Sequence, residues 1–284
     1  MEQITDFNQK PQENTIIVNP EQSFLKDKSF VNFGGTDNIL FVEDGTILAS
    51  NTQIRFQGND ALVYLRKGKR ELQLKVLIST NCCLFIDEGI SSPPNNKILI
   101  KIYEHKNVII GSDCMFSEEI TIRNSDTHLL YDSNTGLRLN ESTSIYIGDH
   151  VWVGIKSSIF RGSTIGSGSI IGSNALVQGK QIPSNTSFAG VPAKLIRSDI
   201  FWSREFVKNW DENKTIKYKK SATDKFIYSD DGNVINITEL DCELCDLQSA
   251  SEKLKFIENK LVNNRAHNRF YIGKSPIEQT KPCS

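Results

Sequence analysis

The stretch IGDHVWVGIKSSIFRGSTIGSGSIIGSNALV, residues 147–177, decides the fold of this protein. An aliphatic residue returns there at every sixth position, and the full set is Ile147, Val153, Ile159, Ile165, Ile171 and Val177. A small residue follows four positions after most of them, at Ser157, Ser163, Ser169 and Ala175. A period of six fits neither an α-helix nor a lone alternating strand, and ordinary hairpins would not hold it. It predicts a β-solenoid, in which every six residues form one flat side and a turn.

The same register continues upstream in a weaker form and then breaks. It can be followed through Ile98, Glu104, Ile110, Phe116 and Ile122, where Glu104 fits only a corner or a locally bulged coil. The next position in the frame holds His128 instead of an aliphatic residue, and the register returns only at Ile147. We therefore expect an excursion loop at about residues 129–144. Loops on a rigid scaffold are where function tends to be placed.

Three regions are expected along the chain: an N-terminal segment, 1–33, a solenoid domain, 34–197, and a C-terminal helical extension and tail, 198–284. Within Ser198–Asp211 the aromatic residues have helical spacing and are expected to pack back on the solenoid; they are Phe201, Trp202, Phe206 and Trp210. An amphipathic helix, docked on its own subunit or on a neighbour, is predicted by Leu247, Ala250, Leu254, Ile257 and Leu261. The tail beyond Lys274 is expected to be disordered.

Composition excludes several classes of protein. The 284 residues are 38% hydrophobic and 24% charged, and they contain no apolar run long enough for a membrane helix. The N-terminus lacks the layout of a signal peptide, so we expect a cytoplasmic protein. A net charge of −1 argues against a nucleic-acid partner. The pair Cys242-Glu-Leu-Cys245 has redox or zinc spacing but no second pair, so no metal is expected.

Two further motifs follow the register break. The segment Ile122–His128 and the segment Gly148-Asp-His-Val-Trp152 place His128 and Trp152 24 residues apart, and Lys180-Gln-Ile-Pro183 and Ala189-Gly-Val-Pro-Ala-Lys194 come later. Over about residues 111–206 the sequence resembles the left-handed β-helix (hexapeptide-repeat) acyltransferases, most of all the bacterial polysaccharide O-acetyltransferases of the polysialic acid type. The resemblance implies a mainly β protein, a left-handed parallel β-helix with a protruding loop and a C-terminal helical extension. It also implies a homotrimer with acetyl-CoA bound between subunits.

The resemblance assigns roles to the two motif residues. His128 would be the general base that removes the proton from a sugar hydroxyl as it attacks the thioester of acetyl-CoA directly, in a ternary complex. Histidine suits this role because it titrates close to neutral pH. Trp152 would be the second active-site residue, with its indole N–H or a nearby backbone N–H stabilising the oxyanion. Asp126 either orients His128 or makes a local turn, and His150 is assigned no chemistry.

Binding of acetyl-CoA along the solenoid requires small side chains, free backbone groups and a few cations. The candidates are Trp152, Lys156, Ser157, Ser173, Ala175, Lys180, Ala189 and Lys194. Lys180 and Lys194 resemble the basic residues that lie near the nucleotide phosphates in the family. The small residues are also what a tight coil requires by itself.

The expected reaction is O-acetylation of a bacterial capsular or surface polysaccharide. A small sugar or a nucleotide-sugar is an alternative acceptor, and a noncatalytic β-solenoid that only binds is an alternative from another class. A zinc lyase on the same scaffold would need three converging histidines. The chain has only His105, His128, His150 and His267, without a close pair.

Overall fold

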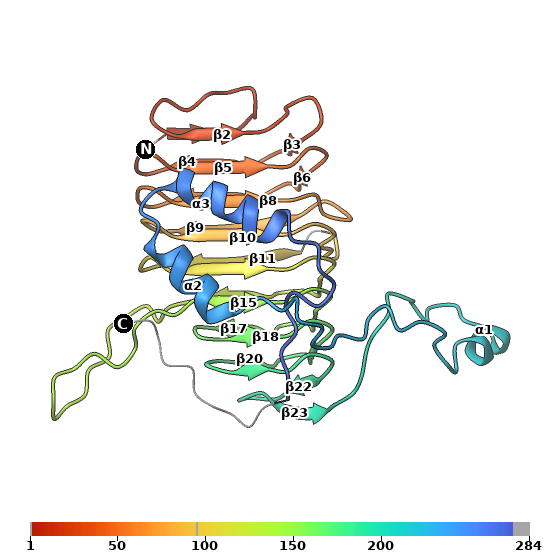
Figure 1. Ribbon diagram of the computed structural model, residues 1–284. Coiled ribbons are helices and arrows are strands. Elements are labelled where there is room, and N and C mark those ends of the chain that lie inside the picture. Colours follow the sequence, from red (N-terminus) through yellow and green to blue (C-terminus); the bar gives the residue numbers. More distant parts are fainter. Residues whose placement is uncertain (1, 95, 275–284) are drawn as a thin grey trace.

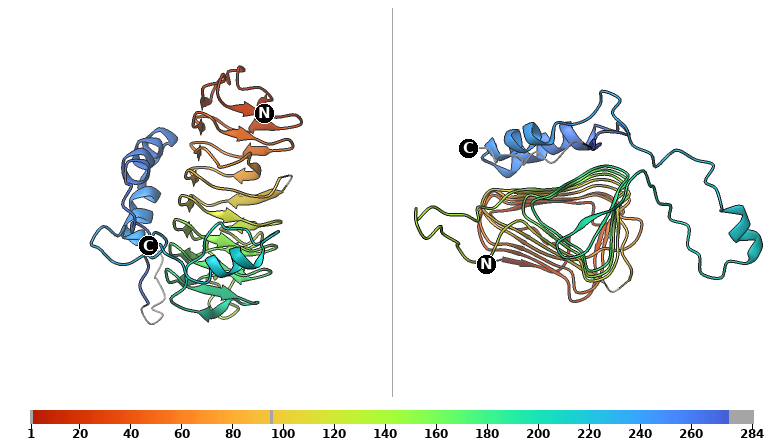
Figure 2. Two further views of the ribbon diagram at one scale, coloured as in Figure 1. Left: turned by 90° about the vertical axis from the view of Figure 1, so that its right-hand side faces the viewer. Right: turned by 90° about the horizontal axis from the view of Figure 1, so that it is seen from below.

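The protein is a stack of coils with three flat faces (Figure 1). The computed structural model describes residues 2–94 and 96–274, so the expected disorder beyond Lys274 concerns residues outside the described part. Seen along its axis, the stack has a triangular outline (Figure 2, right). Each face is a sheet in which a strand of one coil pairs with the corresponding strand of the next.

The strands are divided among the faces in a fixed rotation. The first face holds β1 (Glu2–Ile4), β4 (Phe30–Phe33), β7 (Gln53–Phe56), β9 (Gln73–Ile78), β11 (Lys97–Ile102), β14 (Thr121–Arg123), β17 (Ser158–Phe160) and β20 (Leu176–Val177). The second face holds β2 (Thr15–Ile17), β5 (Ile39–Val42), β8 (Leu62–Leu65), β10 (Cys83–Ile86), β12 (Asn107–Ile110), β15 (Ile145–Ile147), β18 (Thr164–Ile165) and β21 (Gln181–Ile182). The third face holds β13 (Met115–Phe116), β16 (Trp152–Val153), β19 (Ile170–Ile171), β22 (Ser187–Ala189) and the antiparallel β23 (Lys194–Arg197). Near the N-terminus, β3 (Phe24–Leu25) pairs with β6 (Ile47–Leu48).

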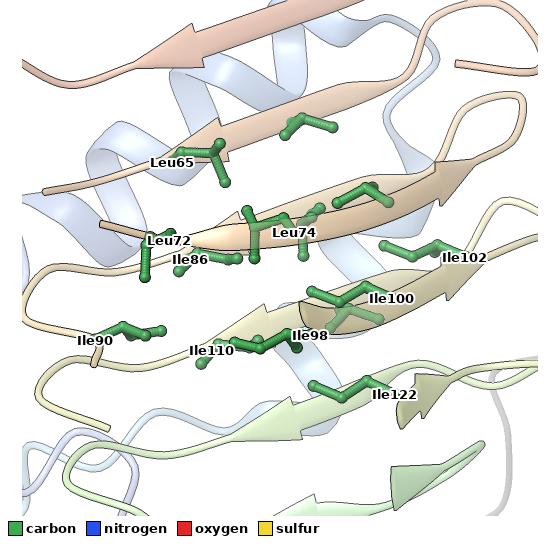
Figure 3. Packing of buried hydrophobic residues seen from close by; sticks show 14 of the residues in the cluster. Leu65, Leu72, Leu74, Ile86, Ile90, Ile98, Ile100, Ile102, Ile110 and Ile122 are labelled. Atoms are coloured by element: carbon green, nitrogen blue, oxygen red, sulfur yellow. The ribbon is translucent and has the colours of Figure 1, made fainter. Parts of the chain in front are cut away.

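Aliphatic side chains fill the interior in columns. On the first face one such column runs, by strand register, through Ile54, Val76, Ile100, Ile122, Ile159 and Val177, and each of them is completely buried. Figure 3 shows the neighbouring leucines and isoleucines that pack with this column. The alternation along a strand follows from the pleat, because successive side chains point to opposite faces of a sheet. The repeated aliphatic residues of the sequence are therefore the inward positions.

Small residues occupy the insides of the corners. Ser157 is fully buried, and its hydroxyl donates to the carbonyl of Gly172 at 2.9 Å. Ser169 donates in the same way to the carbonyl of Pro183 at 2.8 Å. A larger side chain would not fit where the chain turns inside the prism, which explains the small residue four positions after each aliphatic one.

The six-residue period is strict only in the last coils. Tyr146 pairs with Thr164, 18 positions later, which is three sides of six residues. Ile39 pairs with Leu62, 23 positions later, and Ile100 pairs with Ile122, 22 positions later. Longer strands and turns therefore hide the period upstream, and Glu104 falls at a corner with a positive φ of 55°. The stack also includes residues before position 34, because β2 pairs in parallel with β5.

Two helices cover the second face. They are α2 (Ile237–Asp246) and α3 (Ala250–Ile257), the latter continued by a π-helical turn, Glu258–Val262. Leu244 and Ile257 pack on the outward side chains of this face, among them Leu62 and Phe85. The predicted amphipathic helix is confirmed from Ala250 on and docks on its own chain, whereas Leu247 lies before it, at the end of α2. No helix among the described residues is long and apolar enough to cross a membrane.

A long arm, residues 203–225, projects from the corner between the second and third faces and carries the short helix α1 (Glu212–Lys217) (Figure 2, right). The helix expected over Ser198–Asp211 is wrong, because the chain there has no regular structure, and only Trp202 packs closely on the solenoid as expected. Trp202 is buried, but the side chain of Phe206 is 73% exposed. The contacts of Trp202 with the coil override the local helical spacing, and α1 itself has no buried residue.

Candidate active site

The excursion loop leaves the stack at the corner between the first and second faces, after β14 and before β15. His128 lies at its start with an exposed side chain. Asn140 closes the base of the loop, because its amide donates to the carbonyl of His128 at 2.7 Å and accepts from the N–H of Leu130 at 2.9 Å. The structure thus fixes the backbone of His128 and leaves its imidazole facing outward.

Asp126 does not contact His128 within the described chain. Its carboxylate lies 3.3 Å from Nε of Arg161 and accepts from the Asn140 amide at 3.2 Å. The carboxylate is therefore engaged with the base of the loop. Neither expected role, orienting His128 or making a local turn, appears in these contacts, which join Asp126 to Asn140 and Arg161 instead.

A salt bridge ties the far side of the loop to the coil above. Arg138 Nη1 lies 2.8 Å from Glu104 Oε1, and the N–H of Ser142 also donates to this carboxylate. The hydrogen bond from Arg138 lowers the pKa of Glu104 to about 2. Beyond this anchor the loop presents apolar side chains to the outside, each more than half exposed: Leu129, Leu130, Leu137 and Leu139.

Trp152 lies on a different face. It belongs to β16 on the third face, half-buried, and its indole N–H lies 3.4 Å from the hydroxyl of Ser117. Its ring is 5.9 Å from that of Trp202. His128 and Trp152 are thus separated by the edges of the prism, and no contact joins them among the described residues. Any joint action of the two needs a second copy of the chain.

His150 forms a cluster that sequence reasoning missed. Its imidazole is sandwiched between Trp202 and Phe226, with ring centroids 3.9 and 4.0 Å away. Its Nδ1 lies 2.7 Å from Oδ2 of Asp113, and the indole N–H of Trp202 donates to the His150 carbonyl at 2.9 Å. Trp202 and Phe226 flank the two ends of the arm, so His150 holds both ends. The only signal in the sequence was the pair of aromatic residues at the ends of a polar segment.

Asp113 joins this cluster to further cations. Burial raises the pKa of its carboxyl, but the hydrogen bonds from His150 and Lys69 and the charge of Arg204 outweigh it and hold the pKa below the usual value. Arg204 also donates to the hydroxyl of Ser91 at 2.7 Å. The root of the arm is thus fixed beside Trp152 by aromatic stacking and by charge.

The expected cofactor residues divide between the same two regions. Lys156, Ser173, Ala189 and Lys194 lie on the third face or at its corner with the first, in the coils around and beyond Trp152. Lys180 lies at the corner that carries the His128 loop, between β20 and β21. Ser157 and Ala175 are buried inside the coil, so their side chains cannot line an external groove, contrary to expectation. Only a small side chain fits inside the corner at both positions, so their small size is explained by packing and does not indicate a cofactor site.

No cluster of three or more histidine, cysteine or acidic side chains that could hold a metal ion occurs among the described residues. Cys245 of the Cys-x-x-Cys pair is a free thiol that accepts from the Asn107 amide at 3.3 Å. Burial raises its pKa to about 11, which keeps it protonated and unreactive at neutral pH.

Comparison with known proteins places this geometry among acetyltransferases. No family model matches the sequence. The chain is 27% identical over 188 residues to the polysialic acid O-acetyltransferase of Neisseria meningitidis, covering 66% of this chain and 86% of that protein. It is 43% identical over 98 residues to the polysialic acid O-acetyltransferase of Escherichia coli O1:K1, which is 34% of this chain and 32% of that protein. The predicted resemblance is confirmed.

Two solved structures share the fold. The polysialic acid O-acetyltransferase OatWY matches with a TM-score of 0.56 and 23% identity, over 74% of this chain and 97% of that one. The polySia-specific acetyltransferase NeuO matches with a TM-score of 0.51 and 26% identity, over 68% and 98%. These likenesses confirm the predicted fold class, a left-handed parallel β-helix, and the sequence relatives confirm the predicted enzyme class, an acyltransferase.

Proposed function

We propose that this protein transfers an acetyl group from acetyl-CoA to a hydroxyl of a bacterial capsular or surface polysaccharide, in the cytoplasm and as a homotrimer. The proposal is supported by relatives named polysialic acid O-acetyltransferase. The observation that carries it is the placement of His128 at the corner between the first and second faces and of Trp152 on the third face. A groove between two copies brings a His128 loop opposite the Trp152 face of its neighbour.

In this proposal His128 is the general base. Its imidazole takes the proton of the acceptor hydroxyl while the oxygen attacks the thioester carbonyl carbon. The carbon–sulfur bond then breaks, and the coenzyme A thiolate leaves and recovers the proton from the imidazolium. The exposed ring of His128 is accessible for both transfers. The indole N–H of Trp152 makes only a long hydrogen bond to Ser117, at 3.4 Å, and would be redirected toward the oxyanion.

The donor would lie along the third face beyond Trp152. The outward side chains there are small, at Ser187 and Ala189, and Lys156 and Lys194 flank them. Small side chains allow an extended pantetheine arm to approach the backbone, and exposed lysines suit the nucleotide phosphates. Lys180 of the neighbouring copy would approach from the opposite side of the groove.

The test of the base is His128→Ala, which should abolish acetyl transfer to polysialic acid. His105→Ala is a matched control, because His105 is also exposed and lies at the same corner one coil earlier. Both variants should remain trimers by light scattering. Full activity of His128→Ala would refute the assignment.

A mixing experiment tests the shared site. His128→Ala and Trp152→Ala should each be inactive alone. In mixed trimers formed by co-expression, one quarter of the interfaces combine an intact His128 with an intact Trp152, so about a quarter of the wild-type activity should return. No recovery would mean that both residues act from the same chain, whereas activity of Trp152→Ala by itself would show that Trp152 is dispensable.

A further inference from the structure

The three faces of the prism carry different outward side chains. The second face is apolar and is covered by α2 and α3. The third face presents Met115, Trp152 and Ile170, in register with one another. The first face is basic. Half of its outward positions from β7 to β14 carry cations, which we call the basic ladder: Arg55, Lys75, Lys97, Lys101 and Arg123. The other outward side chains there are uncharged: Gln53, Gln73, Leu77, Leu99 and Thr121.

Charge on this face is segregated, not balanced. From β4 to β20 the strands of this face contain no aspartate or glutamate, and its one acid is Glu2 in β1, at the N-terminal end. The whole chain has 33 basic and 34 acidic residues. The strands of the second face contain no charged residue, so the cations are what distinguish the first face. Lys101 and Arg123 are direct register partners, an arrangement of like charges that destabilises a sheet. A ligand of opposite charge would relieve this repulsion between neighbouring cations, so the face is suited to bind one.

The ladder cations are not neutralised by close salt bridges among the described residues. Among the described residues no carboxylate lies within 4.0 Å of Arg55, Lys75, Lys97 or Lys101, and Arg123 reaches Asp126 only at 4.0 Å. The Nε of Arg55 is buried without a hydrogen-bond partner. The nearest acids at the ends of these strands, Asp126 and Glu104, are engaged by Arg161 and Arg138.

The position of the ladder relates it to the proposed reaction. Its last member, Arg123, ends β14, five residues before His128. Adjacent strands lie about 4.8 Å apart, so β7 to β14 span about 14 Å along the axis. If His128 faces the third face of a neighbouring copy, the first face forms one wall of the same groove. The ladder then lies on the side of His128 toward the N-terminus, away from the coils assigned to the donor.

We infer that the first face from β7 to β14 is the acceptor track, and that its ligand is an acidic polysaccharide whose carboxylates contact the basic ladder. This inference rests on the proposed function. Two aromatic residues on the strands that flank the ladder, β4 and β17, favour a glycan over a nucleic acid. Phe30 and Phe160 are covered by the guanidinium groups of Arg55 and Arg123, at 5.2 and 4.8 Å, and so offer no free ring for a base to stack on.

Binding is tested separately from catalysis by working in the His128→Ala background with polysialic acid as the probe. Adding Lys75→Gln and Lys101→Gln should weaken binding about tenfold at low salt and flatten its salt dependence, because two ionic contacts are removed. Lys10→Gln with Lys255→Gln removes the same charge from exposed sites elsewhere and should leave the dissociation constant unchanged. Uncharged dextran should not bind any of these proteins.

Two results of this binding experiment would overturn the inference. The first is an unchanged dissociation constant for the ladder variant. The second is a single-stranded oligonucleotide that binds as tightly as polysialic acid and displaces it, because the face would then be a general polyanion surface.

Activity gives an independent reading in the otherwise wild-type enzyme. The ratio of kcat/KM for long chains to kcat/KM for a disaccharide should fall at least severalfold in Lys75→Gln/Lys101→Gln. The same ratio should stay at the wild-type value in Lys10→Gln/Lys255→Gln. If wild type acetylates polysialic acid and the ratio does not fall, the acceptor track is refuted while the proposed function stands. If wild type acetylates no glycan but the ladder still binds polysialic acid, the proposed function fails instead.

Discussion

The imidazole of His150 lies flat on the indole of Trp202, with ring centroids 3.9 Å apart and ring planes within 7°. Phe226 stacks on the opposite side of the same imidazole at 4.0 Å. His150 of the coil and Phe226 of the C-terminal extension, 76 positions apart in the sequence, thus meet at one corner of the coil. Because Trp202 also contacts Trp152, the arm and the proposed active site share one aromatic cluster.

Removing the central ring should release the arm. His150→Ala deletes both stacking contacts and the hydrogen bond to Asp113, so we expect a loss of about 2–3 kcal/mol in the free energy of unfolding of the extension. Limited proteolysis should cut the arm faster in this variant. Trp210→Ala is the control, because Trp210 lies in the arm and stacks only on Tyr218. Equal cleavage rates in both variants would contradict the role of His150 in holding the two ends of the arm.

The Glu104–Arg138 pair should make the stability of the excursion loop depend on pH. The pKa of Glu104 is lowered from 4.5 to about 2, so its ionised form favours the folded loop. This contribution is complete above about pH 4.5 and is lost as the pH falls toward 2. The difference in Tm between wild type and Glu104→Gln should therefore be present at pH 7 and vanish near pH 2.

The matched test uses the partner residue. Arg138→Gln should show the same loss of the Tm difference at low pH, and the double variant should be no less stable than either single one. Additive effects of the two substitutions would show that the residues act independently.

Arg269 should be far more important for stability than its neighbour Arg265. The guanidinium of Arg269 is 2% exposed, and it donates to Asp149 at 2.7 Å and also to Asp87. Arg269→Met leaves buried carboxylates uncompensated and should cost about 3–5 kcal/mol in chemical denaturation. Arg265 is 45% exposed and lies 3.6 Å from Asp87, so Arg265→Met should cost less than about 1 kcal/mol. Similar losses in the free energy of unfolding for the two variants would show that burial of the guanidinium does not set its contribution to stability.

The last coils of the solenoid could be predicted from the sequence because their interior is locally periodic. One aliphatic residue per side must point inward, and with 18 residues per coil this requirement appears as a strict six-residue repeat. The break at His128 was visible for the same reason. Upstream, coils of 22 and 23 residues satisfy the same requirement without a fixed period. The solenoid was therefore expected to begin only at residue 34, although β2 already pairs with β5.

By itself the sequence determined which residues form the interior, where the loop interrupts it, and that helices follow. Only the tertiary structure decided which side chains lie next to one another on the outer surface. Neighbours on the outside of the prism come from successive coils about twenty residues apart, so the sequence alone did not indicate the basic ladder. The separation of His128 from Trp152 and the clamping of the arm by His150 likewise depend on how many residues each coil takes to turn. Local periodicity records the inside of a coil, whereas the arrangement of its outer surface is set by the register between coils.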